Sequence, residues 1–274
     1  MSEKLIRKEI NAWEKDISYY QPNDFEMVYD GWVNQTFQRL DPEIQSKFFS
    51  KLDDFLFHTH AYLQGSPLQM DTRAAIINNG RVFKSSLEEI QDLKACSIDE
   101  LTYLAQQHIS KGKLYSFLQG GFTGAGGPLL LGFDFPLMVI MNLRVVQQIG
   151  LAFGHEMNHP YEMMLSLKVF HAATLPKRFQ YQAWTQLMHE IKSDNVYLYE
   201  GNDNVTDPSW MDQPLKQTFK ALLILMWKRK LVQGIPVLSI GVGAYFNYHL
   251  TRQVSQYALR FYQKRYLIDK QKEE

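Results

Sequence analysis

Residues 155–159 read His-Glu-Met-Asn-His, the spacing of a zinc-peptidase motif. In such enzymes the two histidines lie on one face of a continuous helix and bind zinc, and the glutamate acts on the metal-bound water. Here Pro160 follows the second histidine, and a proline disfavours helical geometry at the residue before it. Gly154 precedes the first histidine, as a helix-ending glycine does. The local sequence therefore predicts a break in the helix where the metal site would need continuity.

We expect residues 158–162 to cap and begin a new helix, with no metal bound by His155, Glu156 and His159. A zinc-dependent hydrolase that uses these three residues is the second alternative function, and Glu190 is the candidate third ligand.

Other catalytic patterns are weak. The glycine-rich run 120–127 contains no Gly-Lys-Ser/Thr, so it is not a phosphate-binding P-loop, and the chain has no Gly-x-Ser-x-Gly elbow. The single cysteine, Cys96, has no pattern of basic neighbours that would activate a thiol. We predict no catalytic residue and no cofactor, and favour a protein without enzymatic activity.

Four polar residues lie within or near apolar stretches: Asp134, Arg144, Asn247 and Arg252. A buried carboxylate needs a partner, so the favoured interpretation is an internal network that fixes how helices pack. A polar pocket for a ligand such as a lipid headgroup is the alternative interpretation.

Two glycine-rich apolar segments organise the chain. The first holds Gly120, Gly121, Gly124, Gly126 and Gly127 and continues to residue 141, and the second, 231–246, holds Gly241 and Gly243. Glycines let helix backbones approach closely. Asp134 and two prolines interrupt the first run, and the second is shorter than the about 20 residues of a membrane span. We expect buried helices of a soluble core, with shallow, reversible membrane contact as the alternative.

Apolar spacing and helix caps predict helices at about 5–20, 25–39, 41–63, 214–233 and 243–268, and a further helix after a Ser97–Glu100 capping box. Residues 201–213 form the clearest loop, and no sustained strand pattern occurs. The predicted fold is an all-α multi-helix bundle with the two glycine-rich helical segments in its core. We expect one domain, 1–274: amphipathic helices over 1–84, a core over 85–268 and a frayed tail over 269–274.

Charge and cysteine content limit the function further. The 274 residues contain 29 Lys and Arg and 29 Asp and Glu, so the net charge is zero, which argues against a nucleic-acid partner. One cysteine fits a reducing compartment, and the charged N-terminus shows no signal peptide, so we expect a cytoplasmic location. Basic and aromatic residues are interleaved near the C-terminus: Arg252, Arg260, Lys264, Arg265, Lys270, Lys272, Tyr257, Phe261, Tyr262 and Tyr266. We expect basic aromatic helices of this kind to form the surface that contacts an anionic membrane or a partner.

The combination of these motifs resembles the EcsC family of bacterial proteins over about residues 85–268. The segments that carry the resemblance are 120–128, 134–136, 153–160 and 235–252, together with Arg144. The family has no established activity, and its namesake is encoded beside the subunits of an ABC transporter. The resemblance implies a non-enzymatic accessory protein, peripheral at the inner face of the membrane, with transporter subunits or an anionic membrane surface as partners. A lipid- or amphiphile-binding protein is the first alternative. Oligomeric state is not predicted.

Overall fold

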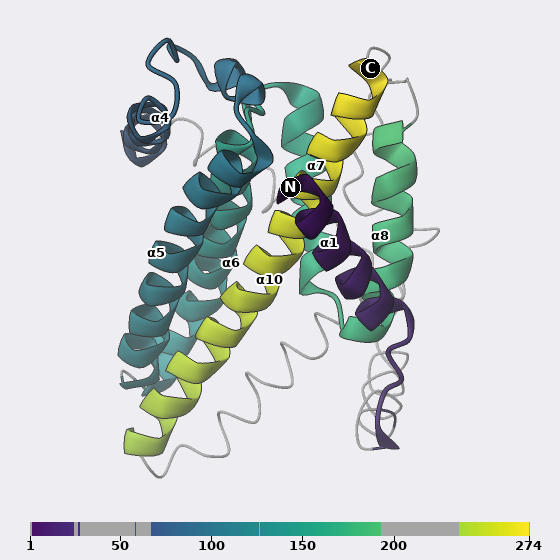
Figure 1. Ribbon diagram of the computed structural model, residues 1–274. Coiled ribbons are helices and arrows are strands. Elements are labelled where there is room, and N and C mark those ends of the chain that lie inside the picture. Colours follow the sequence, from purple (N-terminus) through teal and green to yellow (C-terminus); the bar gives the residue numbers. More distant parts are fainter. Residues whose placement is uncertain are drawn as a thin grey trace.

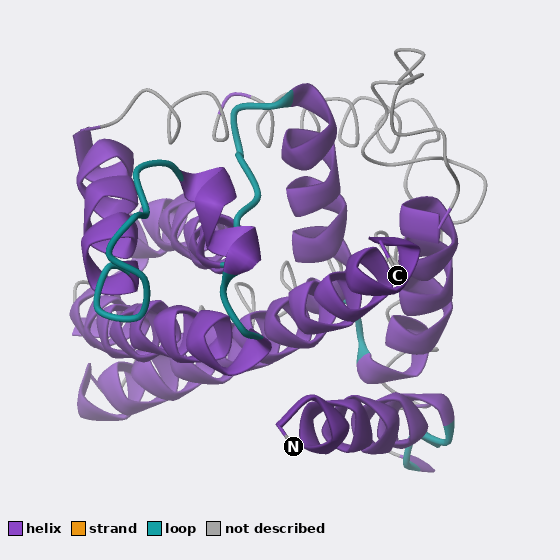
Figure 2. Ribbon diagram, turned by 45° about the horizontal axis from the view of Figure 1, so that its top comes forward, coloured by secondary structure: helices purple, strands orange, loops and turns teal. Residues whose placement is uncertain are grey.

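The computed structural model describes residues 2–24, 67–125, 127–192 and 236–273, together with Met27 and His58. Every regular element in these ranges is a helix, which confirms the all-α class (Figure 2). The predicted helices 25–39, 41–63 and 214–233 and the loop 201–213 lie outside the described residues, apart from the two isolated positions. The described elements are α1 (Ser2–Ser18), α4 (Pro67–Gly80), the 3-10 helix η1 (Ile90–Ala95), α5 (Ile98–Ala125), α6 (Gly127–Ala152), α7 (Pro160–Thr174), α8 (Lys177–Lys192) and α10 (Pro236–Glu273).

The long helices α5, α6 and α10 lie side by side, with α7 and α8 on the far side of α10 (Figure 1). Two hydrogen bonds show that α5 and α10 are antiparallel. Thr251 donates to Ser116 at 2.7 Å within the core, and Gln263 donates to Thr102 at 3.0 Å. The C-terminal part of α5 therefore lies beside the N-terminal part of α10, and both glycine-rich segments come to the same end of the bundle.

Helix α1 is amphipathic, as its spacing predicts, and lies across α10 and against α8 (Figure 1). Ile10 and Ile17 are buried, and the Trp13 ring meets the rings of Trp184 and Tyr257 edge-on, with centroids 4.8 and 5.3 Å away. This aromatic cluster joins the first helix of the chain to α8 and α10.

The start of α5 follows the predicted capping box. The Ser97 amide donates to the Glu100 carboxylate at 2.7 Å, and the Glu100 amide approaches the Ser97 hydroxyl at 3.5 Å. The far end of α10 differs from the prediction, because the helix continues to Glu273 through the expected frayed tail. Lys270 pairs there with Glu3 at 2.5 Å, which holds the last turn against α1.

Helices α5 and α6 approach each other closely at Gly112, a glycine outside the two glycine-rich segments. A Cβ at this position would lie 2.5 Å from Cγ2 of Val145. Valine is stiff at χ1, so its methyl group cannot move aside freely. The absence of a side chain at Gly112 therefore sets the distance between these two helices.

Gly112→Ala should lower the free energy of unfolding by about 1–3 kcal/mol, because the added methyl overpacks the contact with Val145. The double variant with Val145→Ala should recover part of that loss. Urea unfolding measures both, with the exposed Ser110→Ala as the control. Equal stability of Gly112→Ala and the parent chain would contradict this account of the contact.

Candidate functional site

The turn between α6 and α7 breaks the zinc-like motif. Gly154 has φ of +81°, in the left-handed region. The Gly154 amide donates to the Leu151 carbonyl at 2.9 Å, and the His155 amide donates to the Gly150 carbonyl at 3.0 Å. These two bonds form a Schellman motif, which ends α6. Pro160 then occupies the first turn of α7. The predicted helix break is confirmed.

The three motif side chains have different surroundings. His155 is buried, with Nδ1 3.3 Å from a carboxylate oxygen of Glu162. Glu156 accepts two hydrogen bonds from the Arg73 guanidinium on α4, and His159 is exposed. No group of three or more His, Cys, Asp or Glu side chains suited to a metal occurs among the described residues. The candidate third ligand, Glu190, instead pairs with Lys168 at 2.7 Å.

A buried ion pair joins α7 to α10 beside this turn. Arg265 donates two hydrogen bonds of 2.6 Å to the Glu162 carboxylate, and both residues are less than a tenth exposed. Burial alone would raise the pKa of Glu162, but the polar contact with His155 and the two hydrogen bonds and positive charge of Arg265 hold it well below its usual range. The same carboxylate raises the pKa of Arg265, against the effect of burial. Both groups are therefore charged inside the core.

His155 contributes a neutral imidazole to this cluster. Burial lowers its pKa, the charge of Arg265 lowers it further, and Glu162 only partly opposes them. The 3.3 Å contact between Nδ1 and Glu162 lacks the angle of a well-formed hydrogen bond. Beside it, the Tyr262 ring lies 5.6 Å from the imidazole, and its buried hydroxyl has no hydrogen-bond partner in the described part of the chain.

Cys96 lies close to this region but has the properties of a structural residue. Its thiol is buried, and burial, with Glu100, raises the pKa. Its carbonyl accepts a hydrogen bond of 3.1 Å from the Tyr266 hydroxyl. A nucleophilic thiol needs a lowered pKa, so this environment does not activate Cys96.

The four predicted polar residues do not form one described network. Arg144 lies on α6 and donates a hydrogen bond of 3.3 Å to Thr72 of α4. Asn247 is buried on α10, whereas Arg252 is exposed, so the expectation of a core position is wrong for Arg252. Asp134 belongs to α6, but its side chain lies outside the described part of the structure.

The glycine-rich segments are helical where the structure describes their backbone. Helix α5 contains Gly120, which is buried, with Gly121 and Gly124; α6 begins at Gly127, and α10 contains Gly241 and Gly243. Gly126 lies outside the described residues. The close packing predicted for these glycines stays a prediction.

The basic C-terminal helix does not form the open contact surface that the sequence analysis expected. Acidic residues of α1 neutralise its cations: Arg260 pairs with Glu9 at 2.9 Å, Lys264 with Glu14 at 3.0 Å and Lys270 with Glu3 at 2.5 Å. The aromatic residues Tyr257, Phe261 and Tyr262 are buried. That expectation is wrong because α1, from the opposite end of the chain, covers this face.

An exposed apolar surface occurs instead at the opposite end of α10. The solvent-facing side of α5 is polar at Gln106, Ser110 and Lys111 and becomes apolar between Leu114 and Leu118. Leu137 and Tyr245, in the N-terminal halves of α6 and α10, are also exposed. We call this set the apolar end: Leu114, Tyr115, Phe117, Leu118, Leu137 and Tyr245.

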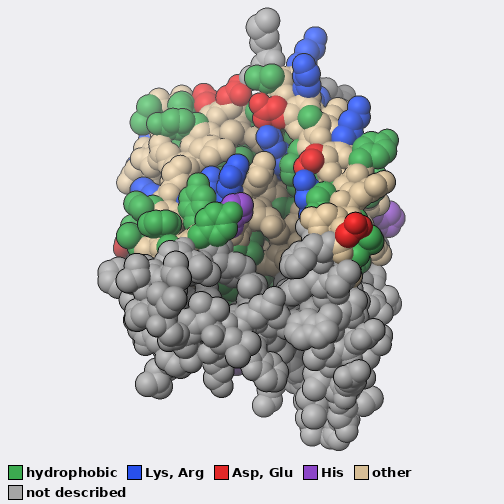
Figure 3. Space-filling model, turned by 90° about the horizontal axis from the view of Figure 1, so that it is seen from below, with side chains coloured by type: hydrophobic (Ala, Val, Ile, Leu, Met, Phe, Trp, Pro, Cys, Tyr) green, Lys and Arg blue, Asp and Glu red, His purple; other side chains and the backbone are tan. Residues whose placement is uncertain are grey.

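Cations lie beside the apolar end. Lys111 and Arg252 are exposed, and Lys113 is half-buried. Burial lowers the pKa of Lys113, and the positive charge of Arg252 lowers it further, which places these two cations near each other. Seen from this end of the molecule, hydrophobic side chains gather beside Lys and Arg side chains (Figure 3). Exposed apolar groups bordered by cations are typical of proteins that touch anionic membrane surfaces.

The described helices contain none that is both long enough and apolar enough to cross a bilayer. A comparison with known protein families shows that residues 4–267 match the EcsC protein family. The match begins at residue 4 and so also includes the part of the chain before residue 85. The uncharacterised protein YdbA of Bacillus subtilis strain 168 is 24% identical over 275 residues, covering 97% of this chain and 93% of that protein. No solved structure matches.

Glu162→Gln should destabilise the fold by about 3–5 kcal/mol, because Arg265 would keep its charge without a buried partner. Replacing both residues, Glu162→Leu with Arg265→Met, should cost much less. The control is the exposed pair of Lys177 and Asp16, where Asp16→Asn should cost less than about 1 kcal/mol. Urea unfolding measures all three. A small loss in Glu162→Gln would mean that the pair is hydrated rather than dry.

Stability should fall as the pH drops from about 6.5 to about 4. Burial lowers the pKa of His108 to about 4 and of His171 to about 3, and it also lowers that of His155. The unfolded chain binds protons below its histidine pKa of 6.5 while the folded chain does not, so each histidine lowers stability by up to about 1.4 kcal/mol per pH unit. The contribution of Glu162 is lost only below its unfolded pKa of 4.5.

Urea unfolding at a series of pH values measures this slope. His108→Gln should reduce it, and the exposed control Ser110→Ala, which removes no titratable group, should leave it unchanged. An unchanged slope in His108→Gln would show that this imidazole gains its proton in the folded state.

Proposed function

The chain belongs to the EcsC protein family, and from that premise we propose that it is a non-enzymatic accessory protein that binds anionic membrane surfaces through its apolar end. The observation that carries the proposal is the change along α5, whose exposed side becomes apolar at Leu114, Phe117 and Leu118. A helix that only faced water would continue its polar pattern there.

The size of the apolar end supports shallow, reversible attachment. Removing one large apolar side chain fully from water is worth about 1.5–3 kcal/mol, and Leu114 and Tyr245 are only partly exposed at 58% and 64%. Each Lys or Arg beside an anionic surface adds about 1 kcal/mol. Lys111, Lys113 and Arg252 can contribute in this way, so the attraction combines a salt-sensitive and a salt-resistant part.

We place the attachment at the cytoplasmic face of the membrane, where anionic lipids attract basic proteins. The family resemblance extends the proposal to subunits of an ABC transporter as the partner. None of the described surfaces bears on binding to transporter subunits, so flotation with vesicles tests membrane binding alone.

Flotation of the purified full-length chain with vesicles tests the membrane step. Vesicles of phosphatidylcholine with phosphatidylglycerol should carry the protein, those of phosphatidylcholine alone should carry much less, and high salt should weaken binding. Leu114→Gln with Leu118→Gln should reduce binding at both salt concentrations, because glutamine keeps the helix but removes apolar surface. Lys111→Glu with Lys113→Glu should reduce it at least tenfold at low salt only.

Matched controls replace similar residues elsewhere on the surface. Tyr181→Gln on α8 removes an exposed apolar side chain, and Lys84→Glu reverses an exposed charge away from the apolar end. Both controls should float like the parent chain, and circular dichroism should show unchanged helix content in every variant. Equal binding by the Leu114 and Leu118 double variant, or no binding by the parent chain, would overturn the proposal.

A further inference from the structure

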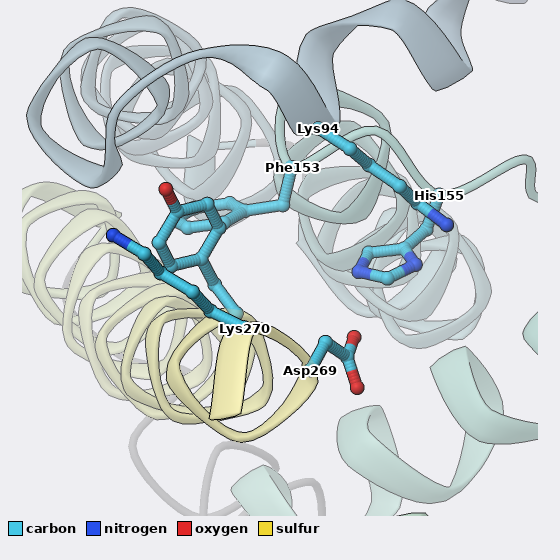
Figure 4. A pocket seen from close by; sticks show the side chains of 6 residues that line it. Lys94, Phe153, His155, Asp269 and Lys270 are labelled. Carbon is cyan, nitrogen blue, oxygen red and sulfur yellow. The ribbon is translucent and has the colours of Figure 1, made fainter. Parts of the chain in front are cut away.

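A cavity of about 150 Å³ lies at the other end of the bundle from the apolar end. It opens where η1, the α6–α7 turn and the last turns of α10 meet (Figure 4). Its walls are Lys94, Phe153, His155, Tyr266, Asp269 and Lys270. Along α5 alone, the distance from Ile98 to Leu118 is about 30 Å, so this cavity is separate from the proposed membrane surface.

The imidazole of His155 presents an unused nitrogen to the cavity. Its Nδ1 edge faces Glu162, and the opposite edge of the ring points into the cavity (Figure 4). The side chain is only 3% exposed, so this wall of the cavity is set deep in the protein. A neutral imidazole whose Nδ1 proton faces a carboxylate has a bare Nε2, which accepts a hydrogen bond.

Two lysines bring positive charge to the same cavity. Lys94 extends over Gly154, where a Cβ would lie 2.7 Å from Cγ of the lysine. The glycine therefore has a second role beside ending α6, because it leaves room for the lysine stem. Lys270 lines the opposite wall and also pairs with Glu3.

One carboxylate, Asp269, also lines the cavity, and its negative charge would repel a bound anion. It lies 3.8 Å from the guanidinium of Arg265, which offsets part of its charge. Arg265 is in turn neutralised by Glu162. Glu3 neutralises Lys270, so Lys94 supplies the positive charge that the cavity offers to a ligand beside the imidazole.

We propose that this cavity binds a small oxyanion that still carries a proton, such as the monoanion of phosphate or of a short phosphate ester. Its anionic oxygen pairs with the ammonium group of Lys94, and its hydroxyl donates to the bare nitrogen of His155. The volume suits this class, because a cavity of similar size in another protein holds one benzene molecule. An acyl chain is too large for it.

The experiment titrates the full-length chain with inorganic phosphate at constant ionic strength, using sulfate as a comparison anion that carries no proton at this pH. Nitrogen-15 NMR of the histidine side chains follows His155 directly, and thermal unfolding reports stabilisation by bound ligand. Phosphate should move the His155 resonances and raise Tm, and sulfate should do much less. A second titration with methyl phosphate, compared with inorganic phosphate, then shows whether the cavity prefers a phosphate ester or the free anion.

Lys94→Ala should weaken phosphate binding at least tenfold, because it removes one charge-assisted contact. Lys94 is exposed, so this variant should fold, and Lys94→Gln is the second variant that keeps the stem over Gly154. The exposed control Lys84→Ala and the double variant Leu114→Gln with Leu118→Gln should bind like the parent chain. Normal phosphate binding by the Leu114 and Leu118 double variant would show that the cavity acts independently of the proposed membrane surface.

Three results would overturn the inference. The first is an equal response to phosphate in Lys94→Ala and the parent chain, which would indicate a general salt effect. The second is an equal effect of sulfate, since sulfate brings no proton for His155. The third is stabilisation by glycine without any by phosphate, which would assign the cavity to a zwitterion held between Asp269 and Lys94.

Discussion

The burial of one long helix on several sides is the constraint on which the described structure depends. Helix α10 has 38 residues, about 57 Å of helix, and packs against α5, α6, α7 and α1. A helix in that position needs apolar or internally satisfied residues around most of its circumference. Its polar groups are accordingly paired: Thr251 with Ser116, and Arg265 with Glu162. The two candidate sites lie near its two ends.

Local sequence rules predicted the start of α5 and the end of α6, because each of these boundaries depends on a few neighbouring residues. The capping box at Ser97 and the glycine at 154 act through backbone groups less than six residues away. The same locality explains why the zinc-like motif could be rejected as a continuous helix from the sequence. Pro160 and Gly154 interrupt it, and the steric effect of each needs no tertiary information.

The sites could not be predicted in the same way, because their partners are distant in sequence. Arg265 meets Glu162 across 103 residues, and Arg260 meets Glu9 across 251, so no spacing pattern reveals either pair. The basic residues of α10 looked like a free surface only because the position of α1 was unknown. The apolar end had a sequence signal that was available but unused: an exposed helix face that changes from polar to apolar after Lys111.

The contact between Glu3 and Lys270 spans 267 residues and so has a consequence for how the protein is made. Helix α1 leaves the ribosome well before its docking partner α10, which is the last described helix to be translated. At about 5–20 residues per second, Ile10 and Trp13 wait on the order of ten seconds or longer for their place in the core. During that interval the amphipathic first helix has an uncovered apolar side, which makes it a natural substrate for the chaperones that attend nascent chains.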